Sequence, residues 1–340
     1  MSNLSTVLGG LEVVPHALVF ADFFQEGSFS AAVVAHSSGS SSNSLYFLKK
    51  SGTSWTDATN TFSGLNRQVC ASVKQLLVAD LNKDAKPDIY VVCGGNSPSP
   101  QYYFLSHPSN LSYTQYTTSF NVMAESASIA DVDGGVNRTS DVITTDNGAV
   151  TVFLGQIDSS GVLTFTQDDA RITNQSPVPN IVQAVTLVPR SQSDSTTRYD
   201  LVLGGSGSNG SSAVWLKNSG GYFGAVGRSF VLPNLGSDGA YPYAELRGYI
   251  ESNGLSYIYA MDHAKSLVRL YSYITPAPTL TDPSPSNSAP SLAYSQAYNT
   301  TSNLPSAGWP YQLVKVGKNF FPLDAACEVT GRCNAMFSLP

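Results

Sequence analysis

One stretch of the chain, residues 78–92, has the composition of a strand, a tight loop and a second strand. Four side chains that carry oxygen atoms stand at loop positions 1, 3, 5 and 9, and they are Asp80, Asn82, Asp84 and Asp88. The backbone carbonyl of Lys86, at position 7, can add a further oxygen. Alternate side chains of a tight loop can converge, and Ca²⁺ accepts about six to eight oxygen ligands in a flexible geometry. The spacing therefore predicts a calcium site between two strands.

Two other interpretations of this loop compete with a calcium site. The first is a solvated turn rich in Asp and Asn, which needs no ion. The second is an EF-hand, whose loop lies between helices and carries a Glu at position 12. Here position 12 is Val91, and residues 89–92 are β-branched or aromatic, as in a strand. The EF-hand is therefore excluded, and the solvated turn stays open.

The strand–loop–strand pattern recurs along the chain. Its anchor residues stand 58, 51, 57 and 59 positions apart, and they are Asp22, Asp80, Asp131, Val188 and Arg247. A period of this size with three or four short strands per repeat is typical of β-propeller blades, which pack face to face because no blade can bury both its faces alone. We therefore predict an all-β fold, a β-propeller of four-stranded antiparallel blades, six or seven in number.

The repeats organise the whole chain, residues 1–340, into one predicted domain. Its expected units lie near residues 17–70, 71–122, 123–178, 179–238, 239–306 and 307–340. Because the last unit is short, we expect the N-terminal residues 7–14 to lend it a strand and close the ring. A seventh blade would have to lie within residues 275–309.

The loop of the third repeat keeps part of the ligand pattern. Two carboxylates take positions 1 and 3, the closing carboxylate arrives two residues late, and an asparagine can substitute as a ligand. The candidate ligands of this second metal site are Asp131, Asp133, Asn137 and Asp141. The alternative is a loop that kept its turn and lost the ion.

The loop of residues 80–88, taken with the repeats, resembles the calcium loop of FG-GAP/VCBS repeats, which build integrin-α-type β-propellers. The resemblance implies Ca²⁺ coordination by the loop ligands named above, with a mainly structural role in which the ion braces a loop on one face of a blade. One residue departs from the family pattern. The family usually has Gly at position 6, where a left-handed backbone is easy, and here position 6 is Ala85.

The cysteines form two local pairs. Cys70 and Cys93 flank the loop hairpin, and Cys327 and Cys333 stand six positions apart near the C-terminus. We interpret both pairs as candidate disulfides of an oxidising compartment, the alternative being four independent thiols. Because the first ten residues lack the basic and apolar regions of a signal peptide, we expect that a leader or upstream domain has been removed from a secreted, cell-surface or periplasmic protein. Synthesis in the cytosol is the alternative.

Charge and composition exclude several kinds of partner. The net charge is −6, and the longest basic run is Lys49-Lys50, so nucleic acid and anionic membranes are poor partners. No apolar run has the length of a membrane span. The four histidines are scattered, and the sequence contains neither H-E-x-x-H nor G-x-S-x-G, which argues against an enzyme.

These observations predict a non-catalytic, calcium-stabilised extracellular β-propeller. We expect it to be a monomer that acts as a binding or adhesion module for a glycan or protein ligand. Two alternatives stay open. The chain can be a scaffold or accessory propeller of a larger secreted carbohydrate-active enzyme, or it can be an enzyme itself, with a pocket at the propeller axis.

Overall fold

The structure of the protein is a computed structural model. It describes residues 7–8, 13–37, 40, 42–52, 54–107, 110–134, 139–159, 161–172, 181–190, 198–207, 210–224, 229–231, 243–250, 256–262, 267–272, 291–297, 310–316 and 319–324.

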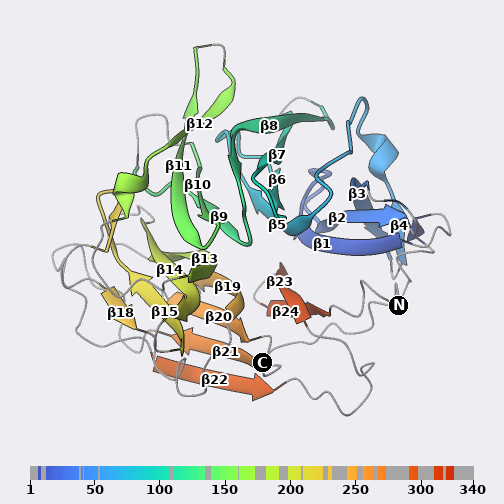
Figure 1. Ribbon diagram of the computed structural model, residues 1–340. Coiled ribbons are helices and arrows are strands. Elements are labelled where there is room, and N and C mark those ends of the chain that lie inside the picture. Colours follow the sequence, from blue (N-terminus) through green and yellow to red (C-terminus); the bar gives the residue numbers. More distant parts are fainter. Residues whose placement is uncertain are drawn as a thin grey trace. The chain divides into compact units, whose positions relative to one another are not determined.

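The chain is all-β, as predicted, and its strands form four-stranded antiparallel sheets (Figure 1). The first sheet contains β1 (Val13–Ala21), β2 (Ser30–Ser37), β3 (Ser44–Ser51) and β4 (Ser54–Asp57). The second contains β5 (Val73–Ala79), β6 (Asp88–Cys93), β7 (Ser99–Ser106) and β8 (Tyr113–Val122). The third contains β9 (Ala127–Ala130), β10 (Asp141–Asp146), β11 (Ala149–Ile157) and β12 (Leu163–Gln167).

The later part of the chain continues this pattern. The fourth sheet contains β13 (Ile181–Arg190), β14 (Arg198–Gly207), β15 (Gly210–Leu216) and β18 (Ser229–Val231). The fifth contains β19 (Tyr243–Ile250), β20 (Ser256–Asp262), β21 (Leu267–Ser272) and β22 (Ser291–Ala297). Two-stranded sheets join β16 (Asn218–Ser219) to β17 (Tyr222–Phe223) and β23 (Pro310–Val316) to β24 (Asn319–Asp324). Two 3-10 turns, η1 (Thr59–Thr61) and η2 (Asp169–Arg171), connect strands.

Each four-stranded sheet falls close to one of the predicted repeat units. The first sheet begins at Val13 rather than at residue 17, because Val13 and Val14 pair with Ser37 and His36 of β2. These two residues therefore belong to the first sheet and not to the β23–β24 pair. Residues 7–14 were expected to complete the last unit. Of these, residues 9–12 lie outside the described ranges.

The second strand of a sheet is covered on both of its faces. All six residues of β6 are buried, and so are Asp141 to Thr145 of β10. A strand with one face in water would alternate buried and exposed residues, whereas continuous burial requires layers on both sides. The β-branched run of β6 suits that position. No helix in the described part of the chain is long and apolar enough to cross a membrane.

The chain divides into two compact units. The first consists of Met1–Glu125, Ile157–Thr164 and Thr300–Pro340, and it holds the first, second and last sheets. The second consists of Ser126–Gln156 and Phe165–Asn299, and it holds the fourth and fifth sheets and most of the third.

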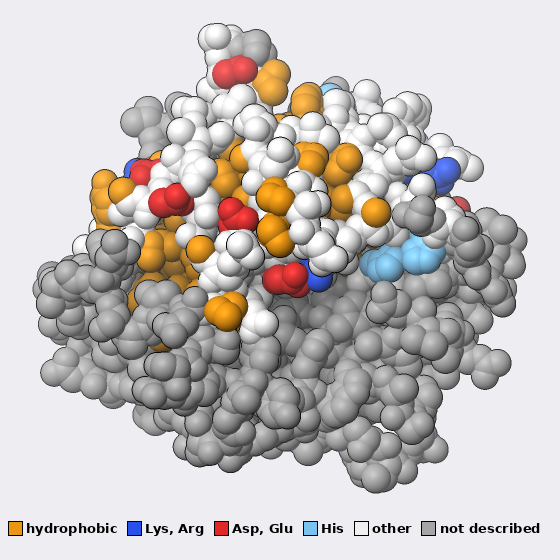
Figure 2. Space-filling model, viewed as in Figure 1, with side chains coloured by type: hydrophobic (Ala, Val, Ile, Leu, Met, Phe, Trp, Pro, Cys, Tyr) orange, Lys and Arg blue, Asp and Glu red, His pale blue; other side chains and the backbone are white. Residues whose placement is uncertain are grey.

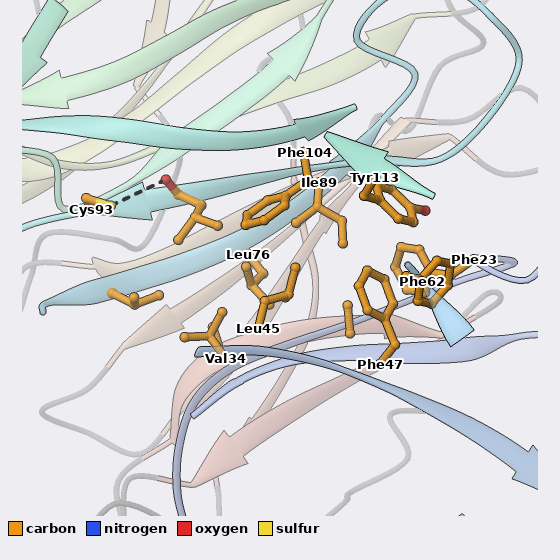
Figure 3. Close-up of a cluster of buried hydrophobic side chains, with 14 of the residues drawn as sticks. Phe23, Val34, Leu45, Phe47, Phe62, Leu76, Ile89, Cys93, Phe104 and Tyr113 are labelled. Atoms are coloured by element: carbon orange, nitrogen blue, oxygen red, sulfur yellow. Dashed lines mark hydrogen bonds between the residues drawn. The ribbon is translucent and has the colours of Figure 1, made fainter. Parts of the chain in front are cut away.

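The core of the first unit joins side chains of the first and second sheets (Figure 3). Phe47 of β3 lies with its ring 4.3 Å from that of Phe62 and 5.1 Å from that of Tyr113. Aliphatic side chains of both sheets complete the cluster, among them Val34, Leu45, Leu76 and Ile89. The second unit has a corresponding core that contains Ile143, Val152, Val185, Leu201, Leu203 and Val214. Neighbouring sheets of a unit therefore share one apolar layer.

The first strands of neighbouring sheets lie side by side. In the first unit, β1 lies beside β5 and also beside β23 of the last sheet. In the second unit, β13 lies beside β9 and beside β19. Both units therefore pack their sheets in the same manner, with the first strand of each sheet against the next.

Several first strands also share a β-bulge. The register shifts near the start of β1, β5, β13, β19 and β23, and the residues passed over are His16, Lys74, Gln183, Ala244 and Tyr311. A bulge of this kind bends the strand and re-aims the side chain of the extra residue. The bulge belongs to the repeat, and the residue type at the bulge differs from sheet to sheet.

Candidate metal centre

The loops that join the first strand of a sheet to the second are closed by the same kind of contacts. An apolar residue at loop position 2 is buried, and its backbone N–H donates to the residue that starts the second strand. These donors are Phe23, Leu81 and Val132, and their acceptors, which we call the closing residues, are Ser30, Asp88 and Asp141. Each closing residue pairs in register with the alanine that precedes loop position 1. This hydrogen bond and the strand pairing therefore fix both ends of the loop.

Two closing residues are carboxylates that also hold the third strand. Asp88 accepts hydrogen bonds from the backbone N–H of Leu81 at 2.8 Å and of Ser106 at 2.8 Å, and from the Ser106 hydroxyl at 3.0 Å. Asp141 accepts from the N–H of Val132 at 2.8 Å and of Gly155 at 2.9 Å. In the fourth sheet, Asp200 similarly accepts from the N–H of a residue beyond the third strand.

Burial makes these two carboxylates hard to ionise. Asp88 is 0% exposed, and desolvation raises its pKa from 3.8 to about 6 against the lowering effect of hydrogen bonds from Ser106 and Leu81. Asp141 is 2% exposed, and desolvation, with a contribution from the charges of Asp133 and Asp131, raises its pKa to about 7. A cation held nearby would favour the ionised form of either group.

In loop 80–88 the carboxylates are engaged by the loop's own backbone. Asp80 accepts hydrogen bonds from the N–H of Asp84 at 2.9 Å and of Ala85 at 3.0 Å. Asp84 accepts from the N–H of Lys86 at 2.9 Å and from the Asn82 amide at 3.2 Å. The carboxylates of Asp80, Asp84 and Asp88 do not bring one oxygen each within 4.8 Å of the others, as the three carboxylates of the next repeat do. The side-chain ammonium of Lys86 donates to the Gln25 side chain at 2.7 Å.

Left-handed residues produce this arrangement. Lys83 has a φ of 62° and Ala85 a φ of 65°, and these turns direct successive amides toward Asp80. Asp22 of the first sheet makes the same pair of contacts with residues four and five positions later, with Gly27 at a φ of 74°. The left-handed backbone expected at Ala85 is therefore present.

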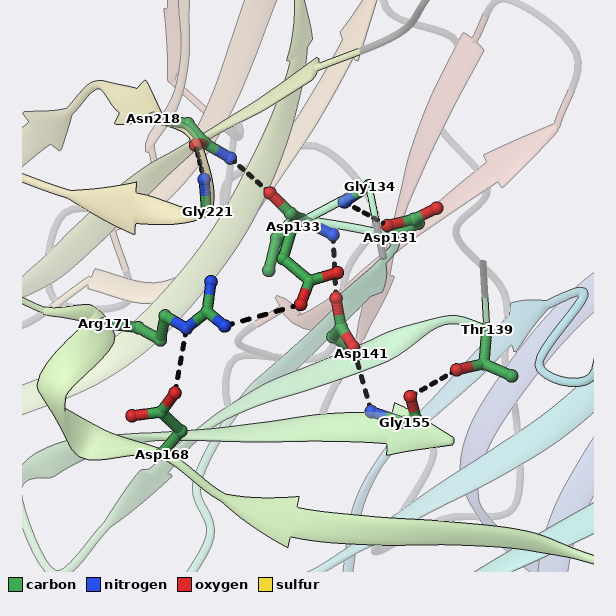
Figure 4. Close-up of polar contacts among 11 residues, drawn as sticks. Asp131, Asp133, Gly134, Thr139, Asp141, Gly155, Asp168, Arg171, Asn218 and Gly221 are labelled. Carbon is green, nitrogen blue, oxygen red and sulfur yellow. Dashed lines mark hydrogen bonds and ion pairs between the residues drawn. The ribbon is translucent and has the colours of Figure 1, made fainter. Parts of the chain in front are cut away.

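Loop 131–141 brings three carboxylates together (Figure 4). One ligand oxygen from each of Asp131, Asp133 and Asp141 lies within 4.8 Å of the others. Asp131 accepts a hydrogen bond from the N–H of Gly134 at 2.8 Å. The predicted fourth ligand, Asn137, lies outside the described residues. Among the residues that the structure describes, Asp131, Asp133 and Asp141 form the acidic group whose geometry could hold an ion.

An arginine borders the acidic group (Figure 4). The guanidinium of Arg171 lies 3.5 Å from a carboxylate oxygen of Asp133 and donates to Asp168 at 2.8 Å. It also lies over the ring of Tyr222, 4.8 Å from the centroid. Arg171 offsets part of the negative charge on the side of Asp133 and leaves the group acidic.

The β16–β17 hairpin, a two-stranded sheet that follows β15, supports loop 131–141. The Asn218 side chain donates to the carbonyl of Val132 at 2.8 Å and accepts from the N–H of Gly221 at 2.8 Å. Gly221 has a φ of 85°, and a Cβ there would lie 2.3 Å from Arg171 and 2.8 Å from the Cβ of Asp133. No side chain fits at Gly221, so the hairpin turn packs directly on the acidic group.

The donor set of loop 131–141 fits a hard cation. Its described ligand atoms are carboxylate oxygens, which Ca²⁺ and Mg²⁺ prefer over nitrogen or sulfur ligands. The group contains one buried carboxylate and two that are partly exposed, Asp131 and Asp133, so an ion can reach it from solvent. Sequence reasoning ranked this loop second and did not find Arg171, Asn218 or Gly221, whose positions depend on contacts distant in the sequence.

The first predicted disulfide is confirmed. Cys70 and Cys93 are bonded, with their Cα atoms 5.9 Å apart, and they join the segment before β5 to the end of β6. The second predicted pair, Cys327 and Cys333, lies outside the described residues.

Comparisons with known proteins assign no family to the chain. No protein-family model matches it, and no curated protein matches it. Among solved structures, NanB with Optactamide has a TM-score of 0.39 and 15% identity over 64% of this chain and 32% of that one. A mutant of the NanB sialidase from Streptococcus pneumoniae has a TM-score of 0.38 and 14% identity over 68% and 32%. The Chaetomium thermophilum Nup170 NTD–Nup53 complex has a TM-score of 0.33 and 11% identity over 78% and 50%.

The chain thus spans a third to a half of the length of these proteins. Similarity at this level carries no argument about activity or ligand. The resemblance to FG-GAP/VCBS repeats stays a prediction.

Proposed function

We propose that the chain is a six-bladed, calcium-stabilised β-propeller in which each of the five four-stranded sheets is one blade and the β23–β24 pair is the sixth. The adjacency of first strands supports this proposal, because propeller blades meet along their first strands around an axis. The contact between β23 and β1 supports it further, because a ring returns its last blade to its first. An open array would leave apolar end faces in water.

Calcium is the ion that we propose for loop 131–141. The gathering of Asp131, Asp133 and Asp141 within 4.8 Å carries this proposal. A bound Ca²⁺ would neutralise carboxylates that otherwise repel one another. Asp131 and Asp133 would hold the ion at the start of the loop and Asp141 at the start of β10, so that binding ties the loop to the sheet.

Calcium in loop 80–88 stays a second, weaker proposal. The ligand set there is Asp80, Asn82, Asp84, the Lys86 carbonyl and Asp88. Binding at this loop would require Asp80 and Asp84 to exchange backbone hydrogen bonds for the ion. A hydrogen bond to a charged acceptor contributes about 1.5–3 kcal/mol, so this exchange weakens binding relative to a loop whose carboxylates already converge.

The function that we propose is a non-catalytic binding or adhesion module outside the cell, with a glycan or protein as its ligand. The Cys70–Cys93 disulfide supports an oxidising compartment, where such bonds persist. Rigid sheets braced by an ion and a disulfide suit a platform that presents loops to a partner.

Two measurements test this proposal. Small-angle scattering of a closed ring of 340 residues should give a radius of gyration of about 20 Å, as for one compact domain, and two separated units would give a larger value. Binding to an array of glycans and surface proteins should be retained in excess calcium and weakened by a chelator. A larger radius would overturn the propeller, and no binding above background would overturn the adhesion role.

A further inference from the structure

Two histidine rings lie against each other on the first sheet. His16 of β1 and His36 of β2 have ring centroids 4.8 Å apart and planes inclined by 30°. The Nε2 atom of His16 lies 2.7 Å from the Nδ1 atom of His36. Both side chains are partly exposed, and Figure 2 shows a pair of adjacent histidine side chains at the molecular surface. The two nitrogen atoms therefore face each other at a place that solvent reaches.

A buried asparagine fixes the proton between the rings. The Asn43 amide nitrogen donates to the carbonyls of Cys70 and Ala71, both at 2.9 Å, so its oxygen faces His36 Nδ1 at 3.2 Å. An oxygen in that place is an acceptor, which assigns the hydrogen to Nδ1 of His36. Nε2 of His16 then accepts the same hydrogen. Two nitrogen atoms and one amide oxygen thus surround a single proton.

The structure assigns a further site to these atoms: we propose that His16 Nε2, His36 Nδ1 and Asn43 Oδ1 bind Cu²⁺ or Ni²⁺. The ion would take the place of the shared proton, which would move to Nε2 of His36, so that Nδ1 binds the ion as the other neutral tautomer. Imidazole nitrogen and amide oxygen are ligands suited to these ions, and neutral histidine is the commonest protein ligand for transition metals. The site differs in chemistry from the carboxylate group of loop 131–141, which takes hard cations.

The separation of the nitrogen atoms is small enough for both to bind one ion. With metal–nitrogen bonds of about 2.0 Å, two nitrogen atoms 2.7 Å apart subtend about 85° at the ion, close to the right angle of square-planar or octahedral sites. Tetrahedral zinc would need a separation of about 3.3 Å. The two rings would turn about their χ2 torsions to direct both lone pairs at one ion, and the separation of the nitrogen atoms would adjust with that rotation. The general order of divalent-ion affinities places Cu²⁺ above both Ni²⁺ and Zn²⁺, so we expect the site to bind Cu²⁺ more tightly than Zn²⁺.

The bulge in β1 places His16 for this role. The register shifts between Pro15 and Ala17, so His16 is the extra residue, and a bulge re-aims the side chain of that residue. The corresponding bulge residue of the second sheet, Lys74, forms an ion pair with Glu125 at 2.8 Å. The bulge is general to the repeat, and the pair of imidazoles is particular to the first sheet.

Titration with CuCl₂ tests the site, in a non-chelating buffer with excess CaCl₂ to occupy carboxylate sites. Calorimetry should find one Cu²⁺ bound per wild-type chain, with Ni²⁺ also bound and Zn²⁺ at least tenfold weaker than Cu²⁺. His16→Gln and His36→Gln should each lower the Cu²⁺ affinity at least tenfold. His107→Gln is the matched control, because His107 is a third partly buried histidine that bonds Thr114 at 2.7 Å, and it should leave the affinity unchanged.

Electron paramagnetic resonance provides the second readout. The Cu²⁺ spectrum of the wild type should show hyperfine coupling to two imidazole nitrogen atoms, and each single variant should lose one of them. Thermal unfolding confirms that the variants are folded before they are titrated. The proposal is overturned if a folded variant that carries both substitutions binds Cu²⁺ as tightly as the wild type, or if zinc binds as tightly as copper.

Discussion

Loops 80–88 and 131–141 occupy the same place in neighbouring repeats and direct their carboxylates differently. Both have a buried apolar residue at position 2 and a buried closing carboxylate with a raised pKa. In loop 80–88 the carboxylate at position 1 accepts two backbone amides. In loop 131–141 three carboxylates approach one another, and Arg171 and the β16–β17 hairpin pack around them.

This difference shows that the number of oxygen side chains in a loop does not decide where an ion fits. Backbone amides compete with an ion for the same carboxylates. The left-handed residues Lys83 and Ala85 turn amides inward, so that Asp80 is satisfied without a metal. A loop binds an ion best when its own backbone leaves the carboxylates facing one another.

The largest effect expected is the loss of calcium-dependent stability. Excess Ca²⁺ should raise the free energy of unfolding of the wild type by about 2.7 kcal/mol at a hundredfold excess over Kd, relative to chelator. Asp133→Asn should abolish this rise because it removes one of the three converging carboxylates. Asp84→Asn, the matched change in loop 80–88, should keep it. Denaturant unfolding measures both, and a reversal of the two results would refute the comparison.

Substitution of the closing carboxylates should destabilise both loops in chelator. An asparagine at position 88 or 141 presents an NH₂ group to a backbone N–H that now donates to the carboxylate. Two donors then face each other in a buried place, at a cost of about 1–3 kcal/mol. Asp88→Asn and Asp141→Asn should therefore lower stability alike, whereas only Asp141→Asn should lose the response to calcium. The exposed Asp169→Asn is the control and should change stability by less than about 0.5 kcal/mol.

Stability should fall as the pH rises, over a different range for each loop. The folded-state pKa is about 6 for Asp88 and about 7 for Asp141, and both return to 3.8 on unfolding. The folded chain therefore holds extra protons, and their stabilising contribution is full below about pH 4 and is lost as the pH rises through 6 and 7, respectively. The slope is at most about 1.4 kcal/mol per pH unit for one carboxyl.

Unfolding measured from pH 4 to pH 8 separates the two carboxyls. Both carboxyls contribute to the slope between about pH 4 and 6, and only Asp141 contributes between about pH 6 and 7. Asp88→Asn should therefore halve the slope below about pH 6, whereas Asp141→Asn should halve it there and also remove the dependence between about pH 6 and 7. Excess calcium should suppress only the part that belongs to Asp141. A profile that is the same with and without calcium would count against an ion in loop 131–141.

The smallest effect expected concerns the left-handed positions. Ala85→Gly should stabilise the chain by about 0.5–1 kcal/mol, because Gly adopts a φ of 65° without strain. Gly134→Ala should cost about 1 kcal/mol, because Gly134 has a φ of 66° and the added Cβ meets no atom within 4 Å, so that only backbone strain is changed. Thermal unfolding in chelator measures both, and shifts of the same sign would contradict this account.

The sequence was sufficient to predict the features that depend on neighbouring residues. Runs such as residues 89–92 predict strands by composition alone, and the repeat spacing places the sheets. The Cys70–Cys93 pair follows from its place on either side of one hairpin. These features need little knowledge of how distant segments meet.

The features that the sequence did not predict depend on contacts between distant residues. The convergence in loop 131–141 involves Arg171 and Asn218, which no local pattern connects to it. His16 and His36 stand 20 positions apart in the sequence and look scattered there, although they lie on adjacent strands. In the register of these strands His36 lies opposite Val14. The bulge between Pro15 and Ala17 then brings His16 beside His36, and the sequence alone does not reveal this bulge.

The closing residues have a consequence for engineering. Each closing residue holds the second strand in register with the first, and these residues are Ser30, Asp88 and Asp141. The loop segments between the paired alanine and the closing residue contain eight, eight and ten residues, respectively. Length has therefore already varied at this point of the repeat without a change in strand register. Since doubling the length of a flexible loop costs only about 0.6 kcal/mol, foreign peptides can be grafted here while the sheets keep their pairing.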